Sequence, residues 1–133
     1  HSMRMFTEVG RRVMAHCTGV GKALLSTLPD DAVRELLART GMPAQTPRTI
    51  TDPEALLVEL ARIRRDGHAV DEGEQEVGVR CVALPVRGPL GTLAVSVSGP
   101  APRMTADVVA RAVPLLRDAG ERLATELAER SSA

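Results

Sequence analysis

The sequence predicts an α+β domain in which an antiparallel sheet is flanked by helices. Two runs rich in Val and Leu between Glu76 and Pro100 are separated by a break with Gly and Pro at residues 87–91, which is typical of a β-hairpin. Three further stretches carry apolar residues at helical spacing, and they cover residues 30–39, 51–66 and 105–129. A chain of 133 residues is long enough for one domain that buries roughly two thirds of its surface.

The two faces of the predicted hairpin differ in chemistry, because side chains alternate between the faces of a strand. The large-residue face carries Val82, Leu84, Val86, Leu93, Val95 and Val97. The small-residue face carries Cys81, Ala83, Thr92, Ala94, Ser96 and Ser98. An antiparallel sheet often has one solvated face, but such a face usually carries Lys, Glu or Arg. We therefore predict that the large-residue face is core and the small-residue face is a pocket floor, with a solvated surface as the alternative.

The chain before residue 30 is expected to hold a short strand and a short helix. The strand is predicted at residues 12–15, after a loop. The helix lies between residues 19 and 28, where Thr18 or Gly19 can cap it and good helix formers follow.

The glycine-rich start of this helix, Gly19-Val20-Gly21, is suited to bind an anion. Backbone N–H groups at a helix start lack partners within the helix, and the helix dipole is positive there. The P-loop pattern fails, because it requires Gly where His16 stands and Ser or Thr where Ala23 stands. We predict a site for a smaller anion such as a carboxylate. The alternative is that the glycines only permit close helix packing.

Two helices are predicted in the middle of the chain. Asp30 is the expected cap of the first, and either Thr51 or Asp52 begins the second. The inward residues are Leu36 and Leu37 in the first helix and Leu56, Leu57, Leu60, Ala61 and Ile63 in the second.

A short strand at residues 68–72 leads into an acidic turn at residues 73–76. Four acids lie within six positions from Asp71, but they lack the spacing of a calcium loop. We predict a solvated acidic turn without a metal. Asp71 is the exception and is kept as a candidate site residue, because it lies where the chain re-enters the sheet.

The last predicted element is a long helix from Thr105, its cap, to about Glu129. Its apolar stripe consists of Val108, Ala112, Leu116, Ala119, Leu123 and Leu127. Pro114 lies inside this helix and is expected to kink or split it, because proline lacks a backbone N–H.

The composition argues against several partners. The 17 basic residues are balanced by 17 acidic ones, and a single Lys and a single aromatic residue offer neither a basic patch nor a stacking platform. Contact with DNA must therefore come from another domain. No apolar run approaches the roughly 20 residues of a membrane span and no signal peptide opens the chain, so we expect a cytoplasmic protein without membrane contact. Cys17 and Cys81 are expected to be free thiols.

Two Cys–His pairs can be drawn as a nucleophile and its base, Cys81 with His68 and Cys17 with His16. A Cys in a Val-rich strand is more often an inert small hydrophobe, so we do not expect catalysis. The same four residues lack zinc-site spacing along the sequence, although ligands can converge in space. We predict no metal and no cofactor.

Five short blocks occur in a characteristic order and spacing. They are Gly19-Val-Gly-Lys-Ala-Leu-Leu, Thr49-Ile-Thr-Asp-Pro, Ile63-Arg-Arg-Asp-Gly-His-Ala-Val-Asp, Gly78-Val-Arg-Cys-Val-Ala and Ser96-Val-Ser-Gly-Pro. Together they resemble the C-terminal effector-binding domain of IclR-type bacterial transcription regulators, over residues 6–127. The resemblance implies a GAF-like fold that senses a small organic acid. We expect this domain at residues 4–130, because His1-Ser2-Met3 looks like a cloning remnant and residues 131–133 look like a tail.

The resemblance also implies a set of effector-binding residues. In the family, a small organic or aromatic carboxylate is held by the start of the glycine-rich helix, an acid, a Cys and two serines. The matching positions here are Gly19, Val20, Asp71, Cys81, Ser96 and Ser98, and the helix-start argument adds Gly21. Backbone N–H groups and serine hydroxyls would donate to the carboxylate. Asp71 would accept from a ligand hydroxyl, or would need a proton or a bridging water beside a carboxylate.

The function implied by the resemblance is control of transcription by a ligand. The effector would alter the geometry of a homodimer or tetramer, and DNA would bind through a helix-turn-helix domain that is absent from this chain. The family domain also begins with about two strands that this chain lacks, so we expect an open sheet edge. Two alternatives are a ligand-free dimerisation module and a GAF-like enzyme that uses Cys81.

Overall fold

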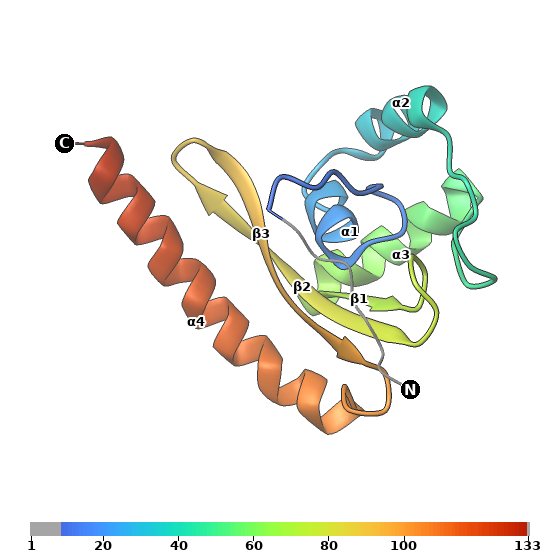
Figure 1. Ribbon diagram of the computed structural model, residues 1–133. Helices are drawn as coiled ribbons and strands as arrows, with labels where there is room; N and C mark the ends of the chain where they lie inside the picture. The colour runs from blue at the N-terminus through green and yellow to red at the C-terminus, as the bar shows by residue number, and fades with distance from the viewer. Residues whose placement is uncertain (1–8, 133) are drawn as a thin grey trace.

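The computed structural model describes residues 9–132, which form one antiparallel sheet and four helices (Figure 1). The strands are β1 (Ala69–Glu72), β2 (Val79–Gly88) and β3 (Gly91–Pro100), in the order β1-β2-β3. The helices are α1 (Gly19–Leu25), α2 (Asp30–Thr40), α3 (Pro53–Asp66) and α4 (Ala106–Ser131). Helices α1, α2 and α3 lie on one side of the sheet and α4 crosses the other side (Figure 1). The predicted α+β class is confirmed.

The β2–β3 hairpin sets the register of the whole sheet. Gly88 pairs with Gly91 at the hairpin tip, and Gly91 has a φ of 131°, which residues with a side chain rarely adopt. Further along, one row of cross-strand neighbours is Asp71, Cys81 and Ser98, and the next row is Ala69, Ala83 and Ser96. The hairpin prediction is confirmed, and β1 extends the sheet on the far side of β2.

Each face of the sheet carries its own core. The core under α4 contains Val82, Leu84, Met104 and Leu116. The core between the sheet and the other helices contains Leu25, Val33, Leu37, Leu56, Leu60, Ile63, Ala69 and Ala83. The large-residue face is therefore core along β2 as predicted, but Leu93 and Val97 on β3 remain 42% and 41% exposed.

Helix caps follow the sequence signals in most places. Thr18 caps α1 by accepting a hydrogen bond from Gly21 N at 3.0 Å. Asp52, rather than Thr51, caps α3, and Pro53 is its first residue. The predicted cap at Asp30 is wrong: α2 has no side-chain cap, and Asp30 Oδ1 instead lies 3.2 Å from Arg64 Nη2.

One of the predicted inward residues on α2 and α3 needs correction. Leu37 is buried and Leu36 is partly buried against the core, as predicted, and Val33 is buried as well. Ala61 is exposed, because it lies about 100° around the helix from the buried Leu60.

Two predictions about regular structure also fail. The strand predicted at residues 12–15 is absent; Val13 and Met14 are exposed, and Met14 O accepts from Thr18 Oγ1 at 2.9 Å instead of pairing with a strand. Helix α4 is not split at Pro114 (Figure 1). Pro114 is exposed, so the carbonyl group that loses its helical partner faces water.

The buried stripe of α4 differs by one position from the prediction. Ala119 is exposed and Gly120 is buried. A Cβ atom at Gly120 would lie 2.7 Å from Val86 Cγ2, so this glycine lets the helix approach the sheet. No helix within residues 9–132 is long and apolar enough to cross a membrane.

Candidate functional site

The predicted site residues of the sheet lie on the face covered by α1. Asp71, Cys81 and Ser98 are cross-strand neighbours, one on each strand, and we call them the polar row. Ser96 lies in the adjacent row, beside Ala83. Beside the polar row, this face of the sheet carries the small side chains of Ala69, Ala83 and Ala94, together with Ser96. Asp71 and Cys81 are buried, whereas Ser96 and Ser98 are exposed on β3.

The start of α1 lies directly against Cys81. A Cβ atom at Gly19 would be 2.9 Å from Cys81 Sγ and 3.3 Å from Ala83 Cβ, so only glycine fits without a shift. A Cβ atom at Gly21 would be 2.4 Å from Ala15 O. Both glycines therefore permit close packing. The N–H of Gly21 already donates to Thr18 Oγ1, which leaves Gly19 and Val20 as the candidate backbone donors for an anion.

The carboxyl group of Asp71 is the strongly perturbed acid of the site. Burial raises its pKa to about 6, and the nearby charge of Glu74 adds to the rise. Lys22 and the backbone N–H groups of Glu74 and Gln75 act in the opposite direction. The N–H of Glu74 donates to Asp71 Oδ1 at 2.7 Å. Asp71 is therefore an acid that changes its charge near neutral pH.

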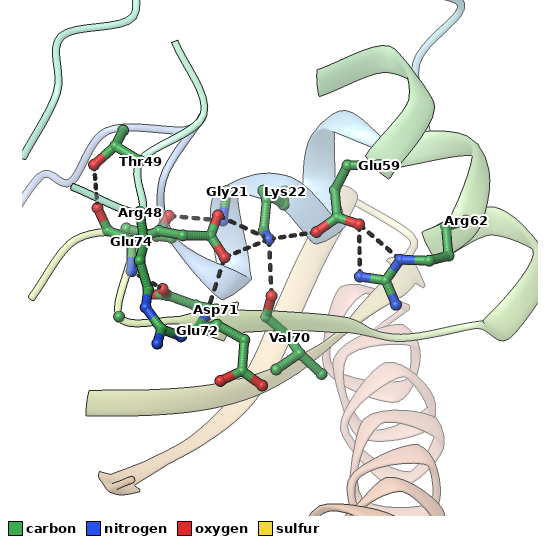
Figure 2. A network of polar contacts seen from close by, with 12 residues as sticks. Gly21, Lys22, Arg48, Thr49, Glu59, Arg62, Val70, Asp71, Glu72 and Glu74 are labelled. Atoms are coloured by element: carbon green, nitrogen blue, oxygen red, sulfur yellow. Dashed lines mark hydrogen bonds and ion pairs between the residues drawn. The ribbon is translucent and has the colours of Figure 1, made fainter. Parts of the chain in front are cut away.

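A buried ion cluster lies behind Asp71, around the only lysine of the chain (Figure 2). The Lys22 side chain is fully buried, and its Nζ donates to Glu59 Oε2 at 2.9 Å and to Val70 O at 2.8 Å. Nζ also lies 3.0 Å from both carboxylate oxygens of Glu74. A buried charge is tolerated only where it is paired and hydrogen-bonded. Lys22 satisfies that condition, whereas the buried Glu74 Oε1 has the ion pair with Lys22 but no hydrogen bond. The cluster joins α1, α3 and β1.

The acidic turn after β1 is not solvated, which corrects the prediction. Glu74 is only 5% exposed, because Lys22 compensates its charge. Its carbonyl oxygen accepts from Thr49 Oγ1, and Thr46 Oγ1 donates to the neighbouring Gly73 O at 2.6 Å. The turn is thus fixed to the loop before α3.

The same cluster covers the outer edge of β1. Val70 O accepts from Lys22, and the N–H of Glu72 donates to Glu74 Oε2 at 3.0 Å. An unpaired strand edge can pair with another chain. Here the side chains of Lys22 and Glu74 occupy two of the backbone groups that such a chain would need. By contrast, within the described residues β3 pairs only with β2.

Neither thiol has the properties of a catalytic nucleophile. Burial raises the pKa of Cys81, although hydrogen bonds from Ser98 and Ser96 lower it in part. Burial raises the pKa of Cys17 to about 11, and the charges of Asp71 and Glu74 contribute. A reactive Cys requires a lowered pKa, so this observation counts against an enzyme that uses Cys81. Within residues 9–132, no group of three His, Cys, Asp or Glu side chains is arranged to hold a metal.

Sequence reasoning missed Lys22, Glu59 and Glu74. One signal was available for Lys22: the single lysine of a chain rich in Arg stands directly before the apolar residues Ala23, Leu24 and Leu25. No local signal marks Glu59 or Glu74, because their partner is 37 and 52 residues away in the sequence.

Comparison with protein families identifies the domain. The family model described as "Bacterial transcriptional regulator IclR C-terminal" matches residues 1–125. The chain belongs to the IclR family. It is an IclR C-terminal effector-binding domain, with the α+β, GAF-like fold of that family.

Individual IclR relatives agree with this assignment. The HTH-type transcriptional repressor AllR of Escherichia coli K12 is 35% identical over 127 residues, which are 94% of this chain and 47% of AllR. The chain thus spans about half the length of the curated relatives it matches. These relatives are transcription regulators and not enzymes.

Two solved IclR-type structures resemble the domain closely. The Thermotoga maritima IclR structure matches with a TM-score of 0.86 and 33% identity over 96% of this chain and 52% of that chain. The inducer-binding domain of the Acinetobacter PobR transcription factor, a double mutant in complex with 3-hydroxybenzoic acid, matches with a TM-score of 0.81 and 30% identity. That match covers 92% of this chain and 73% of the PobR chain.

Proposed function

We propose that this IclR effector-binding domain senses a small carboxylic acid bound over the polar row. The observation that carries the proposal is the row itself: Asp71, Cys81 and Ser98 line up across three strands, beneath the start of α1. The resemblance stated from the sequence implies the same residues. The PobR domain in complex with 3-hydroxybenzoic acid indicates which chemical class to test first.

Each residue has a role in the proposed site. The hydroxyls of Ser96 and Ser98 donate hydrogen bonds to the carboxylate, and the backbone N–H groups of Gly19 and Val20 approach it from the α1 side. Cys81 lies between the helix start and the serines, because its thiol contacts Gly19 and its cross-strand neighbour is Ser98. Asp71 closes the far end of the row.

The proposed output is a change in oligomer geometry. A ligand shifts an equilibrium only through different affinities for two arrangements. In a homodimer or tetramer, that shift would move the helix-turn-helix domains that bind DNA, which the resemblance places in a separate N-terminal part of the regulator. The partners are therefore an effector, further copies of the chain and, through the other domain, DNA.

A thermal-shift screen of small carboxylates and aromatic acids, with 3-hydroxybenzoate as the first probe, tests the proposal. A ligand at 100 times its Kd stabilises the domain by about 2.7 kcal/mol, which raises Tm by several degrees. Ser98→Ala should lose most of that shift. Thr92→Ala is the matched control, since Thr92 lies on the same strand and face but about 20 Å away. Equal shifts in both variants would place the ligand elsewhere.

A ligand-free dimerisation module is the second candidate. It is favoured by the outer edge of β3, which has no strand partner within the described residues, and by the exposure of Leu93 and Val97. Sedimentation separates the two candidates. A dimer that resists dilution, together with no thermal shift from any acid, would support the dimerisation module.

A further inference from the structure

Three carboxyl groups and one lysine meet in the buried ion cluster behind the polar row. Asp71 and Glu74 are 6% and 5% exposed, and Lys22 is fully buried. Glu59 also pairs with Lys22, and Arg62 Nη2 pairs with Glu59 from the outer side of α3. Lys22 therefore already faces two carboxylates, Glu59 and Glu74, before Asp71 ionises (Figure 2).

The groups that face Asp71 come from several elements. Glu74 in the following turn opposes its ionisation, and Lys22 on α1 favours it. Two thiols lie near Asp71, Cys17 before α1 and Cys81 on β2, and burial keeps both of them protonated. The serine of the row, Ser98, is neutral. Among the charged groups, Glu74 therefore raises the pKa of Asp71 and Lys22 lowers it.

An effector carboxylate beside Cys81, between Ser98 and the start of α1, would add a further negative charge near Asp71 on the neighbouring strand. Cross-strand neighbours are about 5 Å apart. At that distance, with an effective dielectric constant of about 20, the repulsion raises the proton affinity of Asp71 by roughly a hundredfold.

We propose that the effector carboxylate binds together with one proton, which Asp71 takes up, because a buried Asp71 beside Glu74 cannot keep its charge next to a second carboxylate. The proposal rests on the proposed function of the site. Protonated Asp71 becomes a hydrogen-bond donor to the ligand. The site then selects an acid with a second oxygen acceptor, such as a hydroxyl or keto group, at the Asp71 end.

Isothermal titration of the wild-type domain between about pH 6 and about pH 8, in two buffers of different ionisation enthalpy, measures the proton uptake. The probes are 3-hydroxybenzoate, lactate and pyruvate, which stay ionised over this range. Since burial places the pKa of Asp71 at about 6, we expect Kd to rise about twentyfold over this range, with close to one proton taken up near pH 7. A Kd that is constant with pH, with the same apparent enthalpy in both buffers, would overturn the inference and leave the proposed function standing. No binding at any pH would overturn both.

Glu74→Gln and Glu59→Gln form a matched pair. Each removes one negative charge next to Lys22, but only the charge of Glu74 raises the pKa of Asp71. The hydrogen bond from the backbone N–H of Glu74 to Asp71 stays in both variants. Glu74→Gln should move the pH profile to lower pH, because the pKa of Asp71 falls when the charge of Glu74 is removed, whereas Glu59→Gln should keep the wild-type profile. The same profile in both variants would contradict the role of Glu74. The wild-type titration decides the proton uptake by itself if Glu74→Gln does not fold.

Discussion

At the scale of single residues, Lys22 determines how the site is built. Its side chain is fully buried and is held by Glu59, Glu74 and the carbonyl group of Val70. A buried ion pair contributes little net stability compared with an apolar replacement, but removal of one partner leaves an uncompensated charge. Lys22 thus holds α1, α3 and the turn after β1 in one arrangement.

Lys22→Met should lower the free energy of unfolding by about 3–5 kcal/mol, because the buried carboxylate of Glu74 loses its cation and Glu59 keeps only Arg62. Urea denaturation measures this change. Arg62→Met is the control and should cost less than about 1 kcal/mol, since the Arg62 side chain is 42% exposed. A loss below about 1 kcal/mol in Lys22→Met would contradict this account, because it would mean that Glu74 does not need the charge of Lys22.

Asp71 should make the domain less stable as the pH rises. Burial raises its pKa from 3.8 to about 6, so the folded state binds the proton more tightly than the unfolded chain. The resulting stabilisation is complete below about pH 4 and is lost as the pH rises through about 6. It amounts to about 3 kcal/mol. The difference in unfolding free energy between the wild type and Asp71→Asn should fall by this amount from about pH 4 to about pH 7, and a constant difference would refute it.

The sequence predicts the residues of the candidate site that depend on local patterns. It does not predict those that depend on partners far away in the chain. Cys81, Ser96 and Ser98 can be placed on one face of β2 and β3 from the sequence alone, because side chains alternate between the two faces of a strand. The burial of Glu74 is not local. An acid in a turn is normally solvated, and only a lysine brought from 52 residues away reverses that expectation.

At the scale of elements, the candidate site depends on the close contact between α1 and β2. Periodicity and turn residues predict the hairpin and all four helices, because apolar spacing and glycine or proline breaks act over a few residues. They fail at residues 12–15, where no partner strand buries Val13, and at Pro114, where the exposed side of α4 tolerates proline. Both failures depend on what packs nearby.

Gly19→Ala should destabilise the domain by about 1–3 kcal/mol, since its Cβ would lie 2.9 Å from Cys81 Sγ and force α1 away from the sheet. Chemical denaturation gives the value. Combining it with Cys81→Ala should recover part of the loss, because the closest atom is then removed. If the double variant lost as much as the sum of the single ones, the contact with Sγ would not be the cause.

Pro114→Ala should stabilise the domain by about 1–3 kcal/mol, because it restores a helical N–H at an exposed position in α4. The change appears as a higher Tm. Leu115→Ala, at a side chain that is 71% exposed, should leave Tm nearly unchanged. A lower Tm in Pro114→Ala would contradict this prediction. It would show that proline stabilises the domain more, by restricting the unfolded chain, than it destabilises the helix.

At the scale of the whole molecule, the two faces of the sheet have separate tasks. The face under α4 is apolar core, and the face under α1 combines core alanines with the polar row. The ion cluster blunts the β1 edge, while the edge of β3, which carries Ser96 and Ser98, has no strand partner within residues 9–132. We infer that a chain segment packed against the outer edge of β3 would be affected by a ligand bound to Ser96 and Ser98.

The measurement that tests this account most directly is an amide chemical-shift map of the domain during titration with the acid that gives the largest thermal shift. We expect the largest changes at Gly19, Val20, Asp71, Cys81 and Ser98, around the polar row. A second group of residues lines a hollow of about 570 Å³ on the α4 side, which includes His68, Val109 and Val113. Changes confined to that hollow would contradict the proposed site.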